Sequence, residues 1–223
     1  MFVDVARAVS RRLLPGGKEF RRLPFGPASG CSMKINYHYD MRLYLGLYEI
    51  ETQKWFRRLV KKGYRSFDVG GAGGYDALLV SRLAGGAEVV SFECEESAVA
   101  DMVETFRRNN YPIKAVKAFV SNCDEGNEVT LDAAAKKYFV PDFIKMDIEG
   151  AEDRALVGAS NIITSRKPNM IVEVHGRGTE EQCQTILSGY GYDPIIVDRL
   201  KVFAEKRPID HNRWLICRGR DFL

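Results

Sequence analysis

From residue 63 onward, short β-branched or aromatic runs alternate with amphipathic stretches long enough to form helices. This alternation is typical of parallel strands joined by helical crossovers, and it predicts a doubly wound α/β sheet. We expect strands at 66–69, 87–92, 113–120, 141–146 and 170–174, a closing pair at 194–197 and 214–217, and helices at 75–83, 97–109, 151–164 and 180–188. In such a sheet, ligands bind at the carboxyl ends of the strands, near the point where the strand order reverses.

Composition excludes several classes of protein. With 45% hydrophobic and 28% charged residues over 223 positions, the chain resembles a folded globular protein rather than a disordered one. Its longest apolar runs are only a few residues, so no transmembrane helix is expected. Its five cysteines are scattered and form no CxxC pair, which argues against a disulfide framework and a zinc knuckle. We therefore expect a cytoplasmic protein.

The first 62 residues differ in charge from the rest. They carry a net charge of +8, whereas the remainder carries −5. Such a segment can attract phosphate or an anionic surface, or it can be a solvated face that pairs with the acids of the body. A Gly/Pro-rich connector at 15–30 follows an N-terminal arm, with a transit peptide as the alternative, and precedes an amphipathic helix at 51–62. We divide the chain into an N-terminal segment, 1–62, and a domain, 63–223.

A glycine-rich turn, residues 67–75, follows the first predicted strand. Glycine lets the backbone approach a ligand closely and adopt positive φ angles. The dinucleotide-binding motif G-x-G-x-x-G fails here, because Asp76 stands at the position of its third glycine. The turn fits the pattern Asp-x-Gly-x-x-x-Gly instead, formed by Asp68, Gly70 and Gly74.

A carboxylate in this turn favours a ligand that carries positive charge, such as S-adenosylmethionine, over a pyrophosphate. The second predicted strand ends in Glu93, where a carboxylate can accept hydrogen bonds from the two hydroxyls of a ribose. The alternative is a glycine turn that serves packing, followed by a surface glutamate.

Three acids follow the predicted strand at 141–146, namely Asp147, Glu149 and Glu152. Clustered carboxylates repel one another unless a cation lies between them, so stability alone explains them poorly. The stretch from Lys145 to Glu152 reads Lys-Met-Asp-Ile-Glu-Gly-Ala-Glu. Because Glu149 and Glu152 open the next predicted helix, we expect at least one of them to cap it.

With this stretch the chain resembles the FkbM-type S-adenosylmethionine-dependent methyltransferases. The resemblance runs over roughly residues 41–176. Two residues or runs depart from the family pattern: Cys94 replaces the usual proline after the ribose-binding acid, and Gly71-Ala72-Gly73 replaces the usual Ala-Asn-x. Besides the stretch from Lys145 to Glu152, the resemblance rests on Glu93 and on segments 45–49, 68–74, 130–132, 157–159 and 171–175.

The resemblance implies a class I methyltransferase fold: a Rossmann-like three-layer α/β sandwich with a mixed seven-stranded sheet whose last strand is antiparallel. It also implies methyl transfer from S-adenosylmethionine, usually to a hydroxyl oxygen of a sugar or natural product. The expected cofactor-binding residues are Asp68, Gly70, Gly74, Tyr75, Glu93, Cys94, Ser121 and Asp147.

The expected catalytic residues are Asp147, Glu173 and His175, at the tips of two predicted strands. Methyl transfer from a sulfonium is an in-line displacement, so the protein must align the reacting atoms and remove the hydroxyl proton. The pKa of histidine suits a general base, and Glu173 shares the face of His175 by strand alternation. The same three side chains can equally hold Mg²⁺ or Mn²⁺, and their spacing does not decide between a base and a metal site.

The sequence does not identify the methyl acceptor. We expect residues 37–39, Tyr-His-Tyr, to belong to an acceptor lid formed by the N-terminal segment, or else to pack that segment on the sheet. The alternatives to a small hydroxylated acceptor are an RNA held by the basic segment and a cofactor-binding protein without activity. A nicotinamide dehydrogenase is disfavoured by the broken glycine motif.

Overall fold

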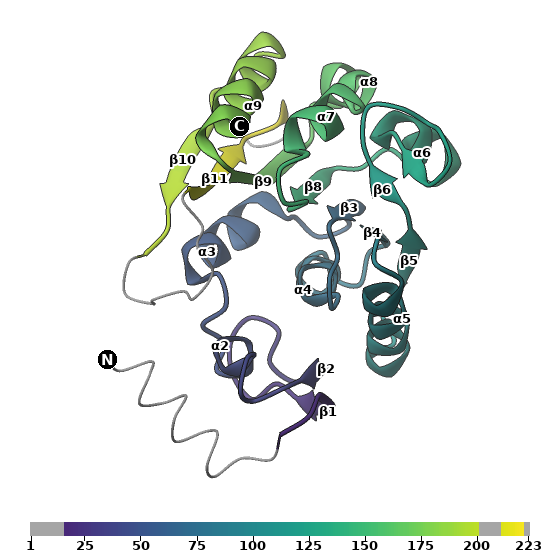
Figure 1. Ribbon diagram of the computed structural model, residues 1–223, viewed down its shortest axis with the longest axis vertical. Helices are drawn as coiled ribbons and strands as arrows, with labels where there is room; N and C mark the ends of the chain where they lie inside the picture. The colour runs from purple at the N-terminus through teal and green to yellow at the C-terminus, as the bar shows by residue number, and fades with distance from the viewer. Residues whose placement is uncertain (1–15, 201–210, 221–223) are drawn as a thin grey trace.

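A central seven-stranded sheet organises the described part of the chain (Figure 1). The structure, a computed structural model, describes residues 16–200 and 211–220. The two central strands of the sheet are β3 (Ser66–Val69) and β8 (Phe143–Met146). Every residue of both is buried, as expected for parallel strands covered on both faces. In the described part of the chain, the sheet contains β3 (Ser66–Val69), β4 (Val89–Glu93), β5 (Ile113–Lys117), β8 (Phe143–Met146), β9 (Asn169–His175), β10 (Ile195–Asp198) and β11 (Asn212–Cys217).

The order of the strands is β5-β4-β3-β8-β9-β11-β10. The first five pair in parallel, whereas β11 runs antiparallel to both β9 and β10. The predicted mixed seven-stranded sheet with an antiparallel last strand is thereby confirmed. The chain leaves β3 toward β4 and β5 and later returns to β8 on the other side of β3, so the order reverses between β3 and β8. The carboxyl ends of these two strands are where a ligand is expected to bind.

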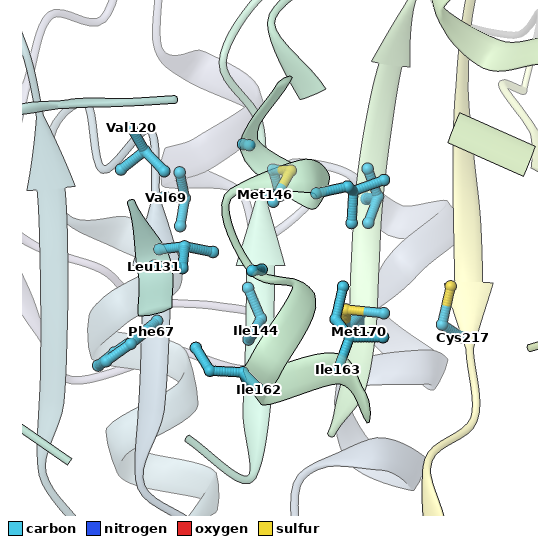
Figure 2. Close-up of a cluster of buried hydrophobic side chains, with 14 of the residues drawn as sticks. Phe67, Val69, Val120, Leu131, Ile144, Met146, Ile162, Ile163, Met170 and Cys217 are labelled. Atoms are coloured by element: carbon cyan, nitrogen blue, oxygen red, sulfur yellow. The ribbon is translucent and has the colours of Figure 1, made fainter. Parts of the chain in front are cut away.

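Helices cover both faces of the sheet and give three layers (Figure 1). Strand residues alternate between two cores: Ile144 and Met146 lie in one, and Phe143 in the other. Figure 2 shows the first core, where Leu131 and Ile162 contribute from the covering helices. This face carries α6 (Leu131–Lys137), α7 (Glu152–Val157), α8 (Ser160–Ser165) and α9 (Arg177–Gly189). The opposite face carries α3 (Ile50–Leu59), α4 (Tyr75–Leu83) and α5 (Glu96–Asn109).

The N-terminal segment packs against the second core. Its strands β1 (Glu19–Arg22) and β2 (Ser32–Ile35) form an antiparallel hairpin, followed by the short α2 (Met41–Tyr44). Met33 and Ile35 are buried in the same core as α4 and α5. The connector expected at 15–30 therefore contains a strand, and the arm expected at 1–14 lies outside the described residues.

Asp101 of α5 holds the hairpin in place. It accepts hydrogen bonds from Lys18 Nζ at 2.7 Å and Lys34 Nζ at 2.6 Å. On the same helix, the side chain of Asn109 exchanges hydrogen bonds with the backbone of Ser32. Polar contacts between residues more than 60 positions apart in the sequence thus add to the apolar contacts of the hairpin.

Two predicted elements are divided in the structure. The helix expected at 151–164 breaks into α7 and α8 at Gly158, where a Cβ would lie 2.1 Å from the carbonyl oxygen of Ser121. Asp132 then caps α8 by accepting hydrogen bonds from the backbone N–H groups of Asn161 and Ile162. The strand expected at 113–120 divides into β5 and β6 (Phe119–Val120), and β6 pairs with β7 (Glu128–Val129).

Within the described ranges, none of the helices has the length and apolarity needed to cross a membrane.

Candidate functional site

The glycine turn after β3 presses against the chain segment that follows β8. Gly70 has a φ of 86°, and a Cβ at this position would lie 1.7 Å from the carbonyl oxygen of Asp147. Gly74, with a φ of 84°, begins α4, and its Cβ would lie 2.6 Å from the ring of Phe106. Only glycine allows both the backbone angles and the close approach, so the turn brings the ends of β3 and β8 together.

Asp68 lies on β3, just before the glycine turn. Its carboxylate is buried and accepts a hydrogen bond of 2.6 Å from Ser91 Oγ. Burial raises the pKa of Asp68 to about 6, while the hydrogen bond from Ser91 and the charge of Lys145 oppose that rise. Asp68 is not among the residues that line the described cavities.

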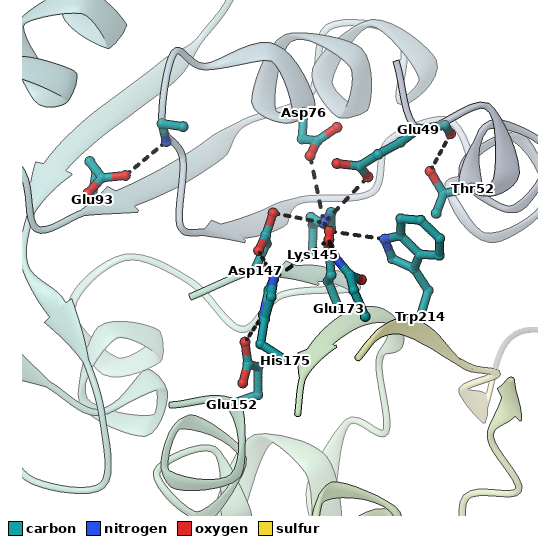
Figure 3. A network of polar contacts seen from close by, with 12 residues as sticks. Glu49, Thr52, Asp76, Glu93, Lys145, Asp147, Glu152, Glu173, His175 and Trp214 are labelled. Atoms are coloured by element: carbon teal, nitrogen blue, oxygen red, sulfur yellow. Dashed lines mark hydrogen bonds and ion pairs between the residues drawn. The ribbon is translucent and has the colours of Figure 1, made fainter. Parts of the chain in front are cut away.

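Glu93 lies on the other side of the turn, at the tip of β4. Its two carboxylate oxygens accept hydrogen bonds of 2.9 Å from the backbone N–H groups of Ala72 and Glu95 (Figure 3). Each oxygen keeps a further lone pair, so the carboxylate can still accept hydrogen bonds from a ligand.

A cavity of about 160 Å³ opens beside Glu93. Cys94 lines it, as expected, whereas Ser121 is buried and accepts a hydrogen bond from the backbone N–H of Cys123 instead. The other lining residues are Gly70, Phe92, Ala118, Phe119, Val120, Asp147, Ile148 and Glu149.

A larger cavity of about 480 Å³ lies between the glycine turn and the N-terminal segment. The domain supplies one wall, which includes Tyr75, Asp76 and Asp147. The N-terminal segment supplies the opposite wall, which includes Lys18, Met33, Lys34, His38, Tyr39, Asp40, Arg42, Leu43 and Tyr48. The structure therefore brings His38 and Tyr39 to a cavity that also contacts the glycine turn.

Lys145 of β8 lies at the centre of the polar network (Figure 3). Its side chain has no exposed surface, and its Nζ lies 3.4–3.9 Å from four carboxylates. Burying an ammonium costs several kcal/mol unless it is paired. The four carboxylates belong to Glu49, Asp76, Asp147 and Glu173.

Glu173 is fixed by neutral donors as well as by Lys145. Its Oε1 accepts a hydrogen bond of 2.7 Å from Asn212 Nδ2, and its Oε2 accepts one of 3.0 Å from Trp214 Nε1. Both donors lie on β11, which pairs with β9 so that Trp214 faces Glu173 across the ladder. The antiparallel last strand thus orients a carboxylate of the site.

His175 is oriented by Glu152 from the other side. Its Nδ1 lies 2.8 Å from Oε1 of the fully buried Glu152, whose oxygens also accept hydrogen bonds from the backbone N–H of Gly150. This contact directs His175 Nε2 toward Asp147 Oδ1 at 3.6 Å and Glu173 Oε1 at 3.7 Å. Glu152, expected as a helix cap, therefore holds the histidine through its side chain.

The distances from His175 Nε2 to Asp147 Oδ1 and to Glu173 Oε1 are both too long for direct hydrogen bonds. One ligand atom from each residue lies within 4.8 Å of the others, a spacing that fits either a cation or a hydroxyl group between them. The structure thus brings together all three expected catalytic residues. A small cavity of about 60 Å³, also lined by Arg42, Tyr48 and Glu49, opens onto them.

Burial and mutual repulsion shift the pKa values of these acids. Burial raises the pKa of Asp147 to about 7, with Lys145 opposing and Glu173 adding to the shift. Burial alone would raise the pKa of Glu173, but Lys145 and the hydrogen bond from Asn212 hold it below its usual value. Burial also lowers the pKa of His175, but Glu152, Asp147 and Glu173 together raise it above its ordinary value.

Residues 104–203 match the family model of the methyltransferase FkbM domain. Over this stretch the chain is similar to the FkbM methyltransferase domain. The match contains the stretch from Lys145 to Glu152, together with Glu173 and His175. A search of curated proteins gives no match.

Solved structures of methyltransferases share the fold of this chain. The methyltransferase FkbM of Methylobacillus flagellatus is 21% identical with a TM-score of 0.58, and the match covers 70% of this chain but 43% of that one. This chain thus spans less than half the length of that relative. A S-adenosylmethionine-dependent O-methyltransferase from Thermotoga maritima is 13% identical with a TM-score of 0.55, covering 77% of this chain and 66% of that one.

The fibrillarin of Aeropyrum pernix, solved with bound S-adenosylmethionine, is 15% identical with a TM-score of 0.51, covering 71% of this chain and 68% of that one. At these identities the matches establish the fold alone. The predicted class I methyltransferase fold is confirmed.

Sequence reasoning missed several residues of the candidate site. Glu49 belongs to it because a left-handed backbone, with a φ of 40°, begins α3 beside β8. Asp76, noted only as the residue that breaks a glycine motif, faces Lys145 from α4. Trp214 was expected only as part of a closing strand, and Asn212 lies before the predicted start of that strand. The excess of acids around Lys145 was the one available signal, since a strand lysine flanked by buried residues needs partners.

Proposed function

We propose that this chain is an S-adenosylmethionine-dependent O-methyltransferase that methylates a hydroxyl group of a small molecule, such as a sugar or natural product. The observation that carries the proposal is the convergence of Asp147 Oδ1, Glu173 Oε1 and His175 Nε2 on one point at the carboxyl edge of the sheet. That point lies beside the glycine turn, where the cofactor of a class I methyltransferase fold is expected.

The cofactor is proposed to bind around the glycine turn. The free lone pairs of Glu93 accept the ribose hydroxyls, and the cavity walled by Cys94, Phe119 and Ile148 takes the adenine ring. Gly70 and Gly74 allow the close approach, and Tyr75 and Asp76 face the methionine end from the start of α4. Asp68 supports this turn without contacting the cofactor.

His175 is proposed to act as the general base. Its Nδ1 donates to Glu152, so the Nε2 lone pair faces the place of the acceptor hydroxyl. As the hydroxyl oxygen bonds to the methyl carbon, the hydroxyl proton passes to Nε2, and the electrons of the breaking carbon–sulfur bond stay on sulfur. The products are the methyl ether, the neutral thioether S-adenosylhomocysteine and an imidazolium that Asp147 and Glu173 stabilise.

The N-terminal segment is proposed to act as the lid over the acceptor. Its residues Tyr39, Arg42 and Leu43 line the large cavity opposite the glycine turn, which gives the cavity both apolar and polar surface. A cavity of about 480 Å³ is in the range of small-molecule sites.

The first test is thermal unfolding with S-adenosylmethionine, S-adenosylhomocysteine or NAD(H). A ligand at about 100 times its dissociation constant stabilises the protein by about 2.7 kcal/mol, which shifts the midpoint by about 5–10 °C at this chain length. We expect both sulfur compounds to raise the midpoint, NAD(H) to leave it unchanged, and Glu93→Ala to lose the effect. Glu95→Ala, which changes an exposed neighbouring acid, is the matched control.

The second test follows the methyl group by mass spectrometry across hydroxylated small molecules and RNA. Transfer to a hydroxyl oxygen, lost in His175→Asn, supports the proposal. Transfer to RNA that charge reversal at Arg57 and Arg58 abolishes would instead assign the basic segment to an RNA acceptor. Stabilisation by NAD(H) alone would contradict the cofactor assignment.

A further inference from the structure

Lys145 has no role in the proposed reaction, yet it is one of the most deeply buried charged residues of the described chain. Its side chain is fully buried and does not line the described cavities. Its Nζ lies 3.4 Å from Glu173, 3.7 Å from Glu49, 3.8 Å from Asp147 and 3.9 Å from Asp76. These four acids come from four different parts of the chain, so Lys145 connects them all.

Stability alone does not explain this number of acids. One or two carboxylates are enough to pair a buried ammonium, and each additional acid adds repulsion among the acids themselves. Burial and the neighbouring acids accordingly raise the pKa of Glu49 well above its usual value, despite the opposing charge of Lys145. Excess negative charge around one lysine indicates a site in which the positive charge serves the reaction.

The geometry divides the oxygens of two carboxylates. Asp147 presents Oδ2 to Lys145 and Oδ1 to His175, and Glu173 presents Oε2 to Lys145 and Oε1 to His175. Glu173 has two further donors on β11, Asn212 and Trp214. For Asp147, the charged partners within ion-pair distance are Lys145 and His175.

We propose that Lys145 is the positioning residue of the site: its ammonium holds Asp147, and secondarily Glu173, so that one oxygen of each faces His175 and the acceptor hydroxyl. The inference rests on the proposed function for the position of that hydroxyl. Lys145 acts through these carboxylates and does not touch the substrate. It also supplies the positive charge that a divalent cation would otherwise bring to Asp147, Glu173 and His175.

Substitution of Lys145 tests this assignment. Lys145→Met keeps the length of the side chain and removes its charge, whereas Lys145→Arg keeps the charge. Lys117→Met, which removes a lysine of the same sheet that pairs with the exposed Glu96, is the matched control. For each variant we would measure kcat, KM for the acceptor, the pH profile of kcat and the thermal shift with S-adenosylmethionine.

We expect Lys145→Met to retain the cofactor-induced thermal shift and to lose about 100-fold in kcat, with a smaller change in KM. The charge of Lys145 lowers the pKa of Asp76, Asp147, Glu49, Glu173 and Asp68, which face it from α4, the loop after β8, the start of α3, β9 and β3. Its removal should therefore move the ascending limb of the kcat profile to higher pH by about one unit. Lys145→Arg should keep the wild-type limb.

Three results would overturn the inference. One is a Lys145→Met protein that keeps kcat within about two-fold of the wild type; another is a loss of kcat with an unchanged pH limb. The third is wild-type activity that is lost in EDTA and restored by Mg²⁺ or Mn²⁺, since the cation of the site would then be a metal. If Lys145→Met does not fold, a limb displaced in Lys145→Arg by more than about half a pH unit overturns it.

Failure of the proposed function gives a different pattern. In that case the wild-type protein itself shows no thermal shift with S-adenosylmethionine or no methyl transfer to hydroxyl groups. A wild-type protein that binds and transfers, together with an unaffected Lys145→Met variant, contradicts the role of Lys145 alone.

Discussion

Individual side chains in this site are oriented by neighbouring residues that take no part in the proposed reaction. Glu152 holds His175 through Nδ1, and Asn212 and Trp214 hold Glu173. Preorganised groups of this kind reduce the reorganisation that the reaction would otherwise require. The residues behind the catalytic groups are therefore as informative to mutate as the catalytic groups themselves.

Glu152→Gln should lower the pKa of His175 and slow methyl transfer. In the wild type the pKa of the His175 imidazole is raised above its ordinary value of 6.5. A general base must be deprotonated, so the reaction should accelerate as the pH rises through that raised pKa. Removing the charge of Glu152 should move this limb of the kcat/KM profile to lower pH and reduce kcat by about 10- to 100-fold. The control is Glu180→Gln, which alters a comparable pair with His211. If the pH limb of the Glu152→Gln variant is unchanged, Glu152 does not influence the pKa of the base.

Relative to the wild type, the Asp68→Asn variant should become more stable as the pH rises from acid to neutral. The folded-state pKa of about 6 is above the unfolded value of 3.8, so the wild type loses stability as the pH rises between these values. The asparagine removes this loss, so the stability of the variant relative to the wild type should increase by up to about 3 kcal/mol between pH 4 and pH 7. Urea unfolding across this range measures the difference. If the stability of the variant relative to the wild type stays constant or falls as the pH rises, the pKa of Asp68 is not raised in the folded protein.

At the scale of elements, the close approach of β3 and β8 gives a sharp prediction. Gly70→Ala places a Cβ against the carbonyl oxygen of Asp147 at a positive φ, so the turn must move. We expect a loss of about 2–4 kcal/mol in unfolding free energy and no thermal shift with S-adenosylmethionine. Gly73→Ala should keep both, because φ is not positive there and the added Cβ would lie no closer than 3.8 Å to its nearest neighbour, Met33 Cε. Equal behaviour of the two variants would contradict the role given to the turn.

The elements also show what the sequence could predict. The pattern of apolar residues predicted the observed bounds of β3 and α4. The residues of β3 pack against layers on both faces of the sheet, and those of α4 pack against one layer, so both patterns are continuous in the sequence. It failed where a distant residue ends an element, as at Gly158, whose boundary depends on contact with Ser121 and capping by Asp132. It also failed for the β1–β2 hairpin, whose pairing depends on contacts with α5.

The same division holds for the site. Asp147, Glu173 and His175 were predictable because parallel strands end at one edge of the sheet. Glu49 and Trp214 were not, because they reach that edge from α3 and from β11, which inserts between β9 and β10. Local patterns identify residues at strand ends, but they do not show which later elements pack beside them.

At the scale of the whole molecule, the N-terminal segment joins the domain through apolar contacts in the second core and through polar contacts around Asp101. Asp101→Asn weakens the ion pairs to Lys18 and Lys34, which are partly exposed and stabilise the fold by at most about 1 kcal/mol. We expect a small fall in the unfolding midpoint but a several-fold rise in KM for the acceptor, because the wall of the large cavity loosens. Glu104→Gln, which breaks pairs within α5 alone, is the control. An unchanged KM would argue against the segment as a lid.

The insertion of β11 between β9 and β10 has a consequence for the order in which the protein matures during synthesis. The glycine turn gains its contact with Asp147 once the chain as far as the end of β8 has left the ribosome, whereas Glu173 gains its partners Asn212 and Trp214 only after β11 has entered the sheet. A nascent chain can therefore assemble its cofactor-binding turn before it can orient the catalytic carboxylate. Methylation competence should appear late in translation, with the last strand.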